Sequence, residues 1–597
     1  MRITSQDGSS PCGVGSFQTQ VAWFGSARGV IRFAVTSVVA MLGLFFGLPK
    51  AWVRAFAAPP AKIDGSAASA NPDAVCAGCH REIYEKYEQT PMARASGPAV
   101  AGLLQGSYFH AASGVRYKVF LRDDKAWMSY DRDDAPEISK ERVALDGERE
   151  LLYFLGSGHR GRTYLYEVAG QWFEIPINFY GKKQLWDMAP NYGASRTMPA
   201  ALPIDSNCLH CHASAVQVAL PGARNHYAGA PFLQGGIGCS ACHGDSAKHL
   251  EEKGRGPIVN PAKLDVTRRD STCLQCHLEG NVAVYRAGKS LAGFRAGDDL
   301  SDYVVYSIKA GANAGGSRAV SQYEALLRSA CKAGSGDKLT CTTCHDPHSS
   351  PSAEERVNYF RARCLSCHTG AKMATGHHPE ERDCAVCHMP SRDTADISHE
   401  QVTDHDIQRR PDSALPIARF LNARDADDLQ PVGKVQVGDR EMGLAYAQLT
   451  VSGNQKDSEK ALRLLLKAER DGASDAELHM KLGLLEQMAS GDSDARKEYA
   501  DSLKEDPYNA TALGNLAILD AVSGHAADAV SLLERAVNAD PSQLTAGLNL
   551  AFIECRVGNK KKALQILTGL TRFDPDDPTL RKFLSSGIYA GERCSLL

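Results

Sequence analysis

The sequence predicts a mostly α-helical protein in two parts: a region rich in cysteine and histidine that contains a small β-rich insert, followed by an α-solenoid. Three observations predict this fold. The motif C-x-x-C-H occurs seven times between residues 76 and 388. Apolar residues alternate with polar ones between the first two motifs, and from about residue 436 alanine, leucine and proline recur with a 34-residue period.

Length and charge indicate how many domains the chain has and which kinds of partner it can bind. A chain of 597 residues is too long for one ordinary domain. Its 67 lysine and arginine residues nearly balance 70 acidic residues, which gives a formal net charge of -3. We therefore expect no nucleic-acid partner.

The N-terminus has the pattern of a secretory signal. Arg28 and Arg32 precede an apolar run over Phe33–Leu48, and the small residues of Ala55–Ala57 form a cleavage pattern. We therefore expect an exported protein, either periplasmic or held at a membrane or cell surface.

Lys50 and Arg54 are unusual near a cleavage site, so an uncleaved membrane anchor stays open. The apolar run is 16 residues long, shorter than the roughly 20 that a spanning helix needs. We expect residues 1–58 to be the signal peptide or N-terminal anchor and residues 59–72 to be a linker.

A β-rich insert is predicted at about residues 105–190, inside a motif-bearing domain of residues 73–410. Apolar residues occupy every second position in two stretches, which is the pattern of half-buried strands. These residues are Val115, Tyr117, Val119 and Leu121, and then Tyr164, Tyr166 and Val168.

The C-terminal period indicates tetratricopeptide repeats, in which small residues let paired helices pack closely and a proline ends each second helix. Four columns keep the spacing: Pro507, Pro541 and Pro575; Gly483, Ala517 and Ala551; Ala495, Ala529 and Ala563; Gly524 and Gly558. Ala461 adds a weaker repeat upstream. We expect a linker at residues 411–435 and the repeats at 436–590, since a generic helical bundle would not keep four columns in register.

The seven motifs use fourteen of the eighteen cysteines. Two thiols at this spacing reach the two vinyl groups of one porphyrin, and the following imidazole binds the iron. The sequence therefore predicts seven covalently bound haem c groups. The motifs are Cys76/Cys79/His80, Cys208/Cys211/His212, Cys239/Cys242/His243, Cys273/Cys276/His277, Cys341/Cys344/His345, Cys364/Cys367/His368 and Cys384/Cys387/His388.

Zinc and disulfides are the alternatives. Seven cysteine pairs do not divide into Cys₄ zinc sites, and zinc does not explain a histidine directly after every second cysteine. A C-x-x-C loop is a poor structural disulfide, and seven of them with histidines would serve no purpose. We assign no role to Cys331, Cys555 and Cys594.

Distal iron ligands are expected among the remaining histidines. Two histidine ligands make iron six-coordinate, which suits electron transfer better than substrate binding. The candidates near the motifs are His249, His348, His378, His399, His405 and His226. Met92 offers a thioether, whereas His110, His159 and His210 are expected to be ordinary histidines.

Residues 76 to about 410 resemble multihaem cytochromes related to the tetrahaem electron carrier of ammonia oxidisers and to the pentahaem and octahaem nitrite and hydroxylamine enzymes. The similar stretches are Gly238–His249, Leu339–His348, Asp383–Pro390 and Thr403–His405. The chain also looks like the exported bacterial cytochromes that are fused to C-terminal tetratricopeptide repeats. The resemblance implies that His249 and His348 are distal ligands.

One departure from these relatives bears on function. The pentahaem nitrite reductases use a C-x-x-C-K motif at the reactive haem, and this sequence contains none. The resemblance therefore argues against a nitrite reductase of the usual kind.

The favoured function is electron transfer between redox partners, such as other cytochromes or quinol-linked membrane donors, with the groove of the repeats docking a protein. The alternative is an oxidoreductase that acts on nitrite, hydroxylamine or another small nitrogen or sulfur compound at one open haem. The Gly158–Tyr164 segment could supply basic groups to such a site, although it also reads as a basic hairpin turn. In a third interpretation the repeats are the main functional part.

Overall fold

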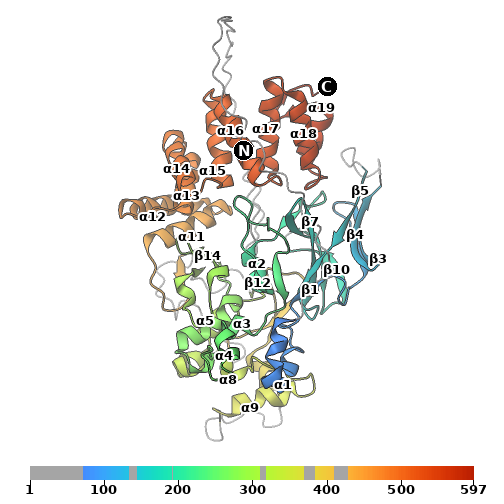
Figure 1. The fold of residues 1–597 in the computed structure, drawn as a ribbon. Helices are drawn as coiled ribbons and strands as arrows, with labels where there is room; N and C mark the ends of the chain where they lie inside the picture. Colours follow the sequence, from blue (N-terminus) through green and yellow to red (C-terminus); the bar gives the residue numbers. More distant parts are fainter. Residues whose placement is uncertain are drawn as a thin grey trace, which may run out of the picture.

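The computed structural model describes residues 71–133, 144–190, 192–309, 317–368, 383–408 and 428–596. The predicted signal or anchor, nearly all of the first linker, and the candidate ligand His378 lie outside these residues. Within the described ranges, no helix is both long and apolar enough to cross a membrane. Short helices, small sheets and a C-terminal run of paired helices make up the fold, so the predicted fold class is confirmed (Figure 1).

Short helices carry the seven motifs. Aspartate side chains cap three of these helices by accepting hydrogen bonds from the first backbone amides. The helices of this region are α1 (Ala77–Tyr87), α2 (Ser206–His210), α3 (Ser240–His243), α4 (Ala247–Glu251), α5 (Val266–His277), α6 (Gln322–Arg328), α7 (Ala330–Ser335), α8 (Cys341–Cys344), α9 (Arg356–Leu365) and α10 (Cys384–His388).

The insert between the first two motifs consists of two antiparallel sheets. A four-stranded meander has the order β2-β3-β4-β5, and a seven-stranded sheet follows the path β1-β6-β7-β8-β11, with β9 on β7 and β10 on β9. The strands are β1 (Ser96–Pro98), β2 (Gly106–His110), β3 (Val115–Arg122), β4 (Lys125–Arg132), β5 (Leu145–Leu151), β6 (Tyr153–Leu155), β7 (Gly161–Val168), β8 (Gln171–Glu174), β9 (Ile177–Tyr180), β10 (Leu185–Met188) and β11 (Leu202–Pro203).

The alternating pattern predicted the inner face of the meander except at its end. Val115, Tyr117 and Val119 are buried, whereas Leu121 is 47% exposed. Leu121 pairs with Ala126 beside the β3–β4 turn, where the sheet extends past its core. The alternation therefore holds only where another layer covers the sheet.

Three small sheets complete the motif-bearing region. Their strands are β12 (Ala213–Val216) with β13 (Phe232–Gly235), β14 (Val282–Tyr285) with β15 (Val304–Lys309) and β18 (Leu429–Pro431), and β16 (Ser391–Asp393) with β17 (Gln401–Thr403). Strand β18 comes from the segment predicted as a linker, yet it extends the β14–β15 sheet.

Paired helices form the C-terminal part. They are α11 (Asp439–Val451), α12 (Ser458–Arg470), α13 (Ala476–Met488), α14 (Asp492–Glu505), α15 (Ala510–Val522), α16 (Ala526–Ala539), α17 (Leu544–Arg556), α18 (Lys560–Leu570) and α19 (Pro578–Ser586), followed by the hairpin β19 (Ile588–Tyr589) and β20 (Glu592–Arg593).

The small residues of the repeats lie where helices meet. Ala495, Ala529 and Ala563 have no exposed surface. A Cβ atom at Gly483 would lie 2.7 Å from the ring of Tyr499, so a larger residue could not pack there. These contacts explain why the sequence keeps its 34-residue columns.

The turns inside the repeats need a left-handed backbone. Gly524 and Gly558 take φ of +88° and +96° there, as glycine readily does. One repeat earlier, the same position is Ser490, with φ of +66°. The serine therefore adopts a conformation that disfavours side chains.

The last repeats are fixed to the β-rich insert (Figure 1). Arg132 of β4 donates two hydrogen bonds to Asp576, at 2.8 and 2.6 Å, and both side chains are almost fully buried. Asp576 also accepts from the Met198 amide at 2.7 Å and pairs with Arg581 at 2.8 Å. The other end of the repeats is fixed as well, because Arg440 of α11 donates to the Tyr285 carbonyl at 3.0 Å.

A disulfide closes the C-terminus. Cys555 of α17 bonds to Cys594, which follows the final hairpin. Neither cysteine could be assigned a role from the sequence, because 39 residues separate them and no motif marks them.

Candidate haem-binding site

One large cavity runs through the motif-bearing region. Its volume is about 4150 Å³, at least four times that of an ordinary small-molecule pocket of about 300–1000 Å³. All fourteen motif cysteines and all seven motif histidines line it. The structure therefore gathers all seven motifs around one continuous space.

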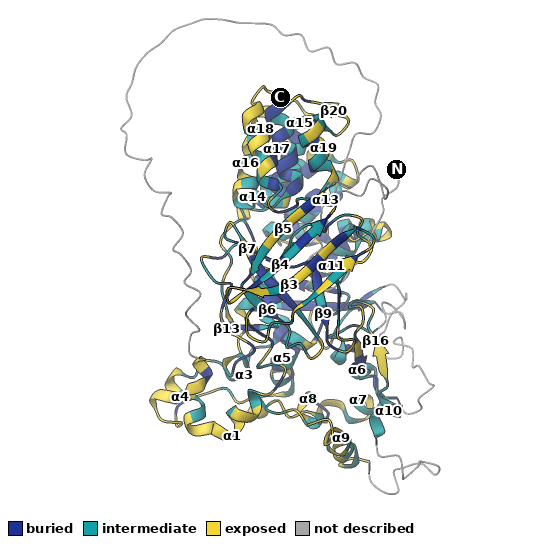
Figure 2. Cartoon of the chain, turned by 90° about the vertical axis from the view of Figure 1, so that its right-hand side faces the viewer, coloured by how far each residue is buried: buried dark blue, intermediate teal, exposed yellow. Residues whose placement is uncertain are grey.

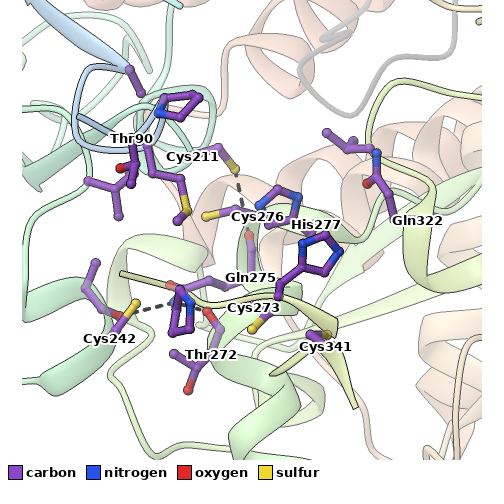
Figure 3. Close-up of a pocket in the computed structure, with 18 of the residues that line it drawn as sticks. Thr90, Cys211, Cys242, Thr272, Cys273, Gln275, Cys276, His277, Gln322 and Cys341 are labelled. Carbon is purple, nitrogen blue, oxygen red and sulfur yellow. Dashed lines mark hydrogen bonds between the residues drawn. The ribbon is translucent and has the colours of Figure 1, made fainter. Parts of the chain in front are cut away.

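Cysteines of different motifs meet inside this cavity. Cys211 of the second motif lies within hydrogen-bonding range of Cys276 of the fourth, and Cys273 of the fourth lies within hydrogen-bonding range of Cys341 of the fifth. Figure 3 shows the residues around His277 where these motifs converge. Groups attached to these thiols would sit side by side.

Gln275, inside the fourth motif, holds neighbouring motifs together. Its Oε1 lies 2.8 Å from Nε2 of His210, and its Nε2 donates to the Ala241 carbonyl at 3.3 Å. On another side of the cavity, Asp73 and the thiols of Cys76 and Cys239 come within 4.8 Å of one another. The first and third motifs are therefore also adjacent.

Three histidine pairs face each other across the cavity. Ring centres are 6.4 Å apart for His80 and His249, 6.0 Å for His243 and His348, and 6.2 Å for His345 and His405. The ring planes within each pair are 7 to 23° from parallel. A metal ion bonded to two imidazole nitrogens at about 2 Å each puts the ring centres about 6 Å apart, so each pair matches axial ligation of one iron.

Backbone carbonyls orient several of these rings. The carbonyls of Val259, Gly256 and Thr403 lie 2.8, 3.1 and 2.9 Å from Nδ1 of their respective histidines, which are His243, His249 and His405. A bond at Nδ1 fixes the tautomer and leaves Nε2 for the metal. Burial also lowers the pKa of His345 to about 4, which keeps the imidazole neutral for ligation.

Exposed aliphatic side chains surround the same cavity and suit a porphyrin, and Figure 2 shows that helices α1 and α4, which carry two of them, are largely exposed. Each of these residues is between 38% and 65% exposed, which is costly unless an apolar group covers the side chain. These residues are Val75, Ile83, Leu250, Ile258 and Val386. Thiols, facing imidazoles and apolar walls together fit haem c.

The comparisons with known protein families agree with this chemistry. Residues 184–244 match the family described as cytochrome c554 and c-prime, and residues 333–373 match the doubled CXXCH motif. Residues 523–586 match the tetratricopeptide repeat. The chain is a multihaem c-type cytochrome fused to tetratricopeptide repeats.

Solved structures similar to part of this chain include repeat proteins. YrrB, a TPR protein with an unusual peptide-binding site, is 20% identical and covers 23% of this chain and 69% of its own, with a TM-score of 0.21. MamA from Desulfovibrio magneticus RS-1 is 18% identical over 24% and 81%, and PilF of Pseudomonas aeruginosa is 23% identical over 24% and 67%, each with a TM-score of 0.22. No curated protein matches the chain.

The structure does not bring every candidate ligand to the haem cavity. Nε2 of His399 lies 2.6 Å from the Asp187 carboxylate, and neither His399 nor His226 lines the cavity. Among the histidines expected to be ordinary, His159 and His210 do line it, as does Met92. The only sequence signal for His210 was its place inside the second motif.

A basic group lies near the fourth motif of the cytochrome. Arg160 and Lys182 each approach Glu400, with nitrogen to oxygen distances of 3.7 Å. Burial lowers the pKa of His277, and the charge of Arg160 lowers it further. Arg160 therefore places positive charge near the His277 ring.

Proposed function

We propose that this protein is an exported seven-haem cytochrome that passes electrons between redox partners, while its repeats dock a partner protein. One observation carries the proposal: all seven motifs line one cavity, and cysteines of different motifs are in contact within it. Covalent attachment at these positions would bring haems close enough for electrons to pass between them. The paired histidines support six-coordinate iron at three of the haems, which suits electron transfer.

The residues of the chain set the properties of the site. Bound haem supplies one-electron iron chemistry. The histidines would supply axial ligands, and the carbonyls at Nδ1 would raise their basicity. The Cys555–Cys594 disulfide supports export, because disulfides persist in oxidising compartments.

The test is electron paramagnetic resonance of the oxidised protein after c-type maturation, with the haem number measured by mass. Seven haems, all low-spin, are the expected result. Fewer haems, or failure of the reduced protein to pass electrons to a soluble cytochrome acceptor, would contradict the proposal.

The second candidate function is oxidoreduction of a small nitrogen or sulfur compound at an open haem. The positive charge of Arg160 near His277 favours it, because a cation there could bind an anion. Within the described ranges, no facing histidine pair forms at His277. A high-spin signal that nitrite or hydroxylamine alters would favour this candidate over the first.

A further inference from the structure

The second and fourth motifs contact each other in both directions. Both have leucine at the first variable position of the motif, and they have His210 and Gln275 at the second. The sulfur of Cys211 lies 3.8 Å from the Gln275 carbonyl oxygen, and the sulfur of Cys276 lies 4.0 Å from the His210 carbonyl oxygen. The two short segments therefore form a reciprocal pair, of which Figure 3 shows Cys211, Cys276 and Gln275.

A hydrogen bond between two side chains closes this pair. Nε2 of His210 lies 2.8 Å from Oε1 of Gln275. Because the amide oxygen of glutamine only accepts hydrogen bonds, the imidazole is the donor. Gln275 is 5% exposed, and its amide nitrogen donates to the Thr272 and Ala241 carbonyls, at 2.9 and 3.3 Å. The amide of Gln275 is therefore fixed from the other side, with its oxygen directed at the His210 ring.

The two motifs are anchored in different apolar clusters. Leu209 of the second motif is buried with Trp172 in the cluster of the β-rich insert. Leu274 of the fourth motif is buried in a separate cluster with Phe294 and Tyr306. Packing within either cluster therefore leaves the orientation of one motif relative to the other to the contacts between the two motifs.

The bond between His210 and Gln275 is a polar contact that haem attachment leaves intact. Attachment turns each cysteine thiol into a thioether, which has no hydrogen to donate to a carbonyl. The imidazole and the amide take no part in that chemistry, because they occupy the variable positions of C-x-x-C-H. A hydrogen bond in a partly buried place is also electrostatically stronger than one in water. This bond can therefore hold the two motifs together once they carry haem.

We propose that the hydrogen bond between His210 and Gln275 sets the relative orientation of the haems on the second and fourth motifs, and thereby how strongly the two porphyrins couple. Both are positioning residues, because they act on the haems only through the segments that carry Cys211 and Cys276. This inference rests on the proposed haem loading and on electron transfer between neighbouring haems. It gives His210 a role that its place inside a motif does not require.

The test is circular dichroism in the Soret band of the haem-loaded full chain, because neighbouring porphyrins give a split signal whose size depends on their distance and orientation. His210→Leu removes the donor but keeps the motif, so this variant should lose part of the split signal and still carry seven haems by mass. A variant without the second haem, Cys208→Ala with Cys211→Ala, gives the share of the signal that this haem contributes. Ser366→Leu is the matched control and should behave as the wild type does, since Ser366 has the same position in the sixth motif and donates to the Arg363 carbonyl of its own segment.

Two further variants test the bond from both sides. His210→Gln keeps a side-chain donor of similar reach, so it should retain the split signal that His210→Leu loses. Gln275→Met removes the acceptor and replaces His210→Leu if that variant does not mature; it should lose at least as much of the signal, because Gln275 also bonds to Ala241. A wild-type signal in His210→Leu or in Gln275→Met would overturn the proposal. An equal loss in His210→Leu and His210→Gln would overturn it as well, since the bond would then not be the cause.

Axial ligation of an iron is the competing role for His210, which lines the haem cavity. Electron paramagnetic resonance separates the two roles. His210→Leu should leave every low-spin haem low-spin, whereas a new high-spin signal in this variant would refute positioning and assign His210 to an iron. Both spectra are recorded on the resting oxidised protein, so a failure to pass electrons to a partner would not alter them. Fewer than seven haems by mass in the wild type would instead contradict the haem loading itself.

Discussion

Neutralising Asp576 is expected to destabilise the contact between the repeats and the β-rich insert. Asp576 is fully buried and accepts two hydrogen bonds from Arg132, which is itself 4% exposed on its side chain. Asp576→Asn leaves the Arg132 charge buried without its counter-charge, a change that typically costs about 3–5 kcal/mol. Because Asp576→Asn also removes the charge that pairs with Arg581, we expect a loss of stability in the upper half of that range.

Differential scanning calorimetry is the suitable assay, since a protein with two parts need not unfold in one step. The transition of the repeats should move to lower temperature in Asp576→Asn. Arg116→Met is the control, because its ion pair with Asp131 is half exposed and worth less than about 1 kcal/mol. A double variant with Arg132→Met should be less destabilised than the sum of the two single variants. Additive effects, or a shift no larger than that of the control, would refute the reasoning.

Four further predictions follow from single contacts. His348→Ala should turn one haem high-spin in the electron paramagnetic resonance spectrum, whereas His399→Ala should leave the spectrum unchanged. Cys555→Ser should lower the free energy of unfolding by up to about 4 kcal/mol in urea titrations, because the disulfide closes a long loop. Ser490→Gly should raise the free energy of unfolding by about 1 kcal/mol, because glycine adopts the left-handed backbone conformation at this position without strain. Burial raises the pKa of Asp574 to about 7. The stability that this raised pKa contributes is therefore complete below about pH 4 and is lost as the pH rises through 7. Asp574→Asn should flatten that part of the plot of unfolding free energy against pH.

The sequence predicted those parts of the fold that depend on local spacing. The motifs fix where thiols and proximal histidines must lie, and the repeat columns fix how Ala495 and Gly483 pack. Partners distant along the chain could not be predicted in the same way. His80 and His249 are 169 residues apart and meet only because the chain folds around one cavity.

The same limit applies to the contact between the two parts. Neither Arg132 nor Asp576 stands out in the sequence, because each charge can be buried only when it pairs with the other. Strand β18 was predicted as linker because Leu429–Pro431 is too short to show a period, and pairing with β15 alone makes it a strand. Among the candidate ligands, proximity to a motif predicted His249, His348 and His405 but also suggested His399, which pairs with Asp187 instead.

Anchorage of the repeats at both ends also bears on the thermodynamics of docking. The contact at Arg440 and the contact at Asp576 leave the solenoid no free end to swing like a tethered module. A partner that binds the repeats therefore does not have to restrict the motion of a flexible linker, a cost that usually weakens binding through a mobile arm. A bound partner is also held at one distance and orientation from the cavity. The local concentration of the partner at the haems is therefore set by the geometry of the repeats rather than by the length of a linker.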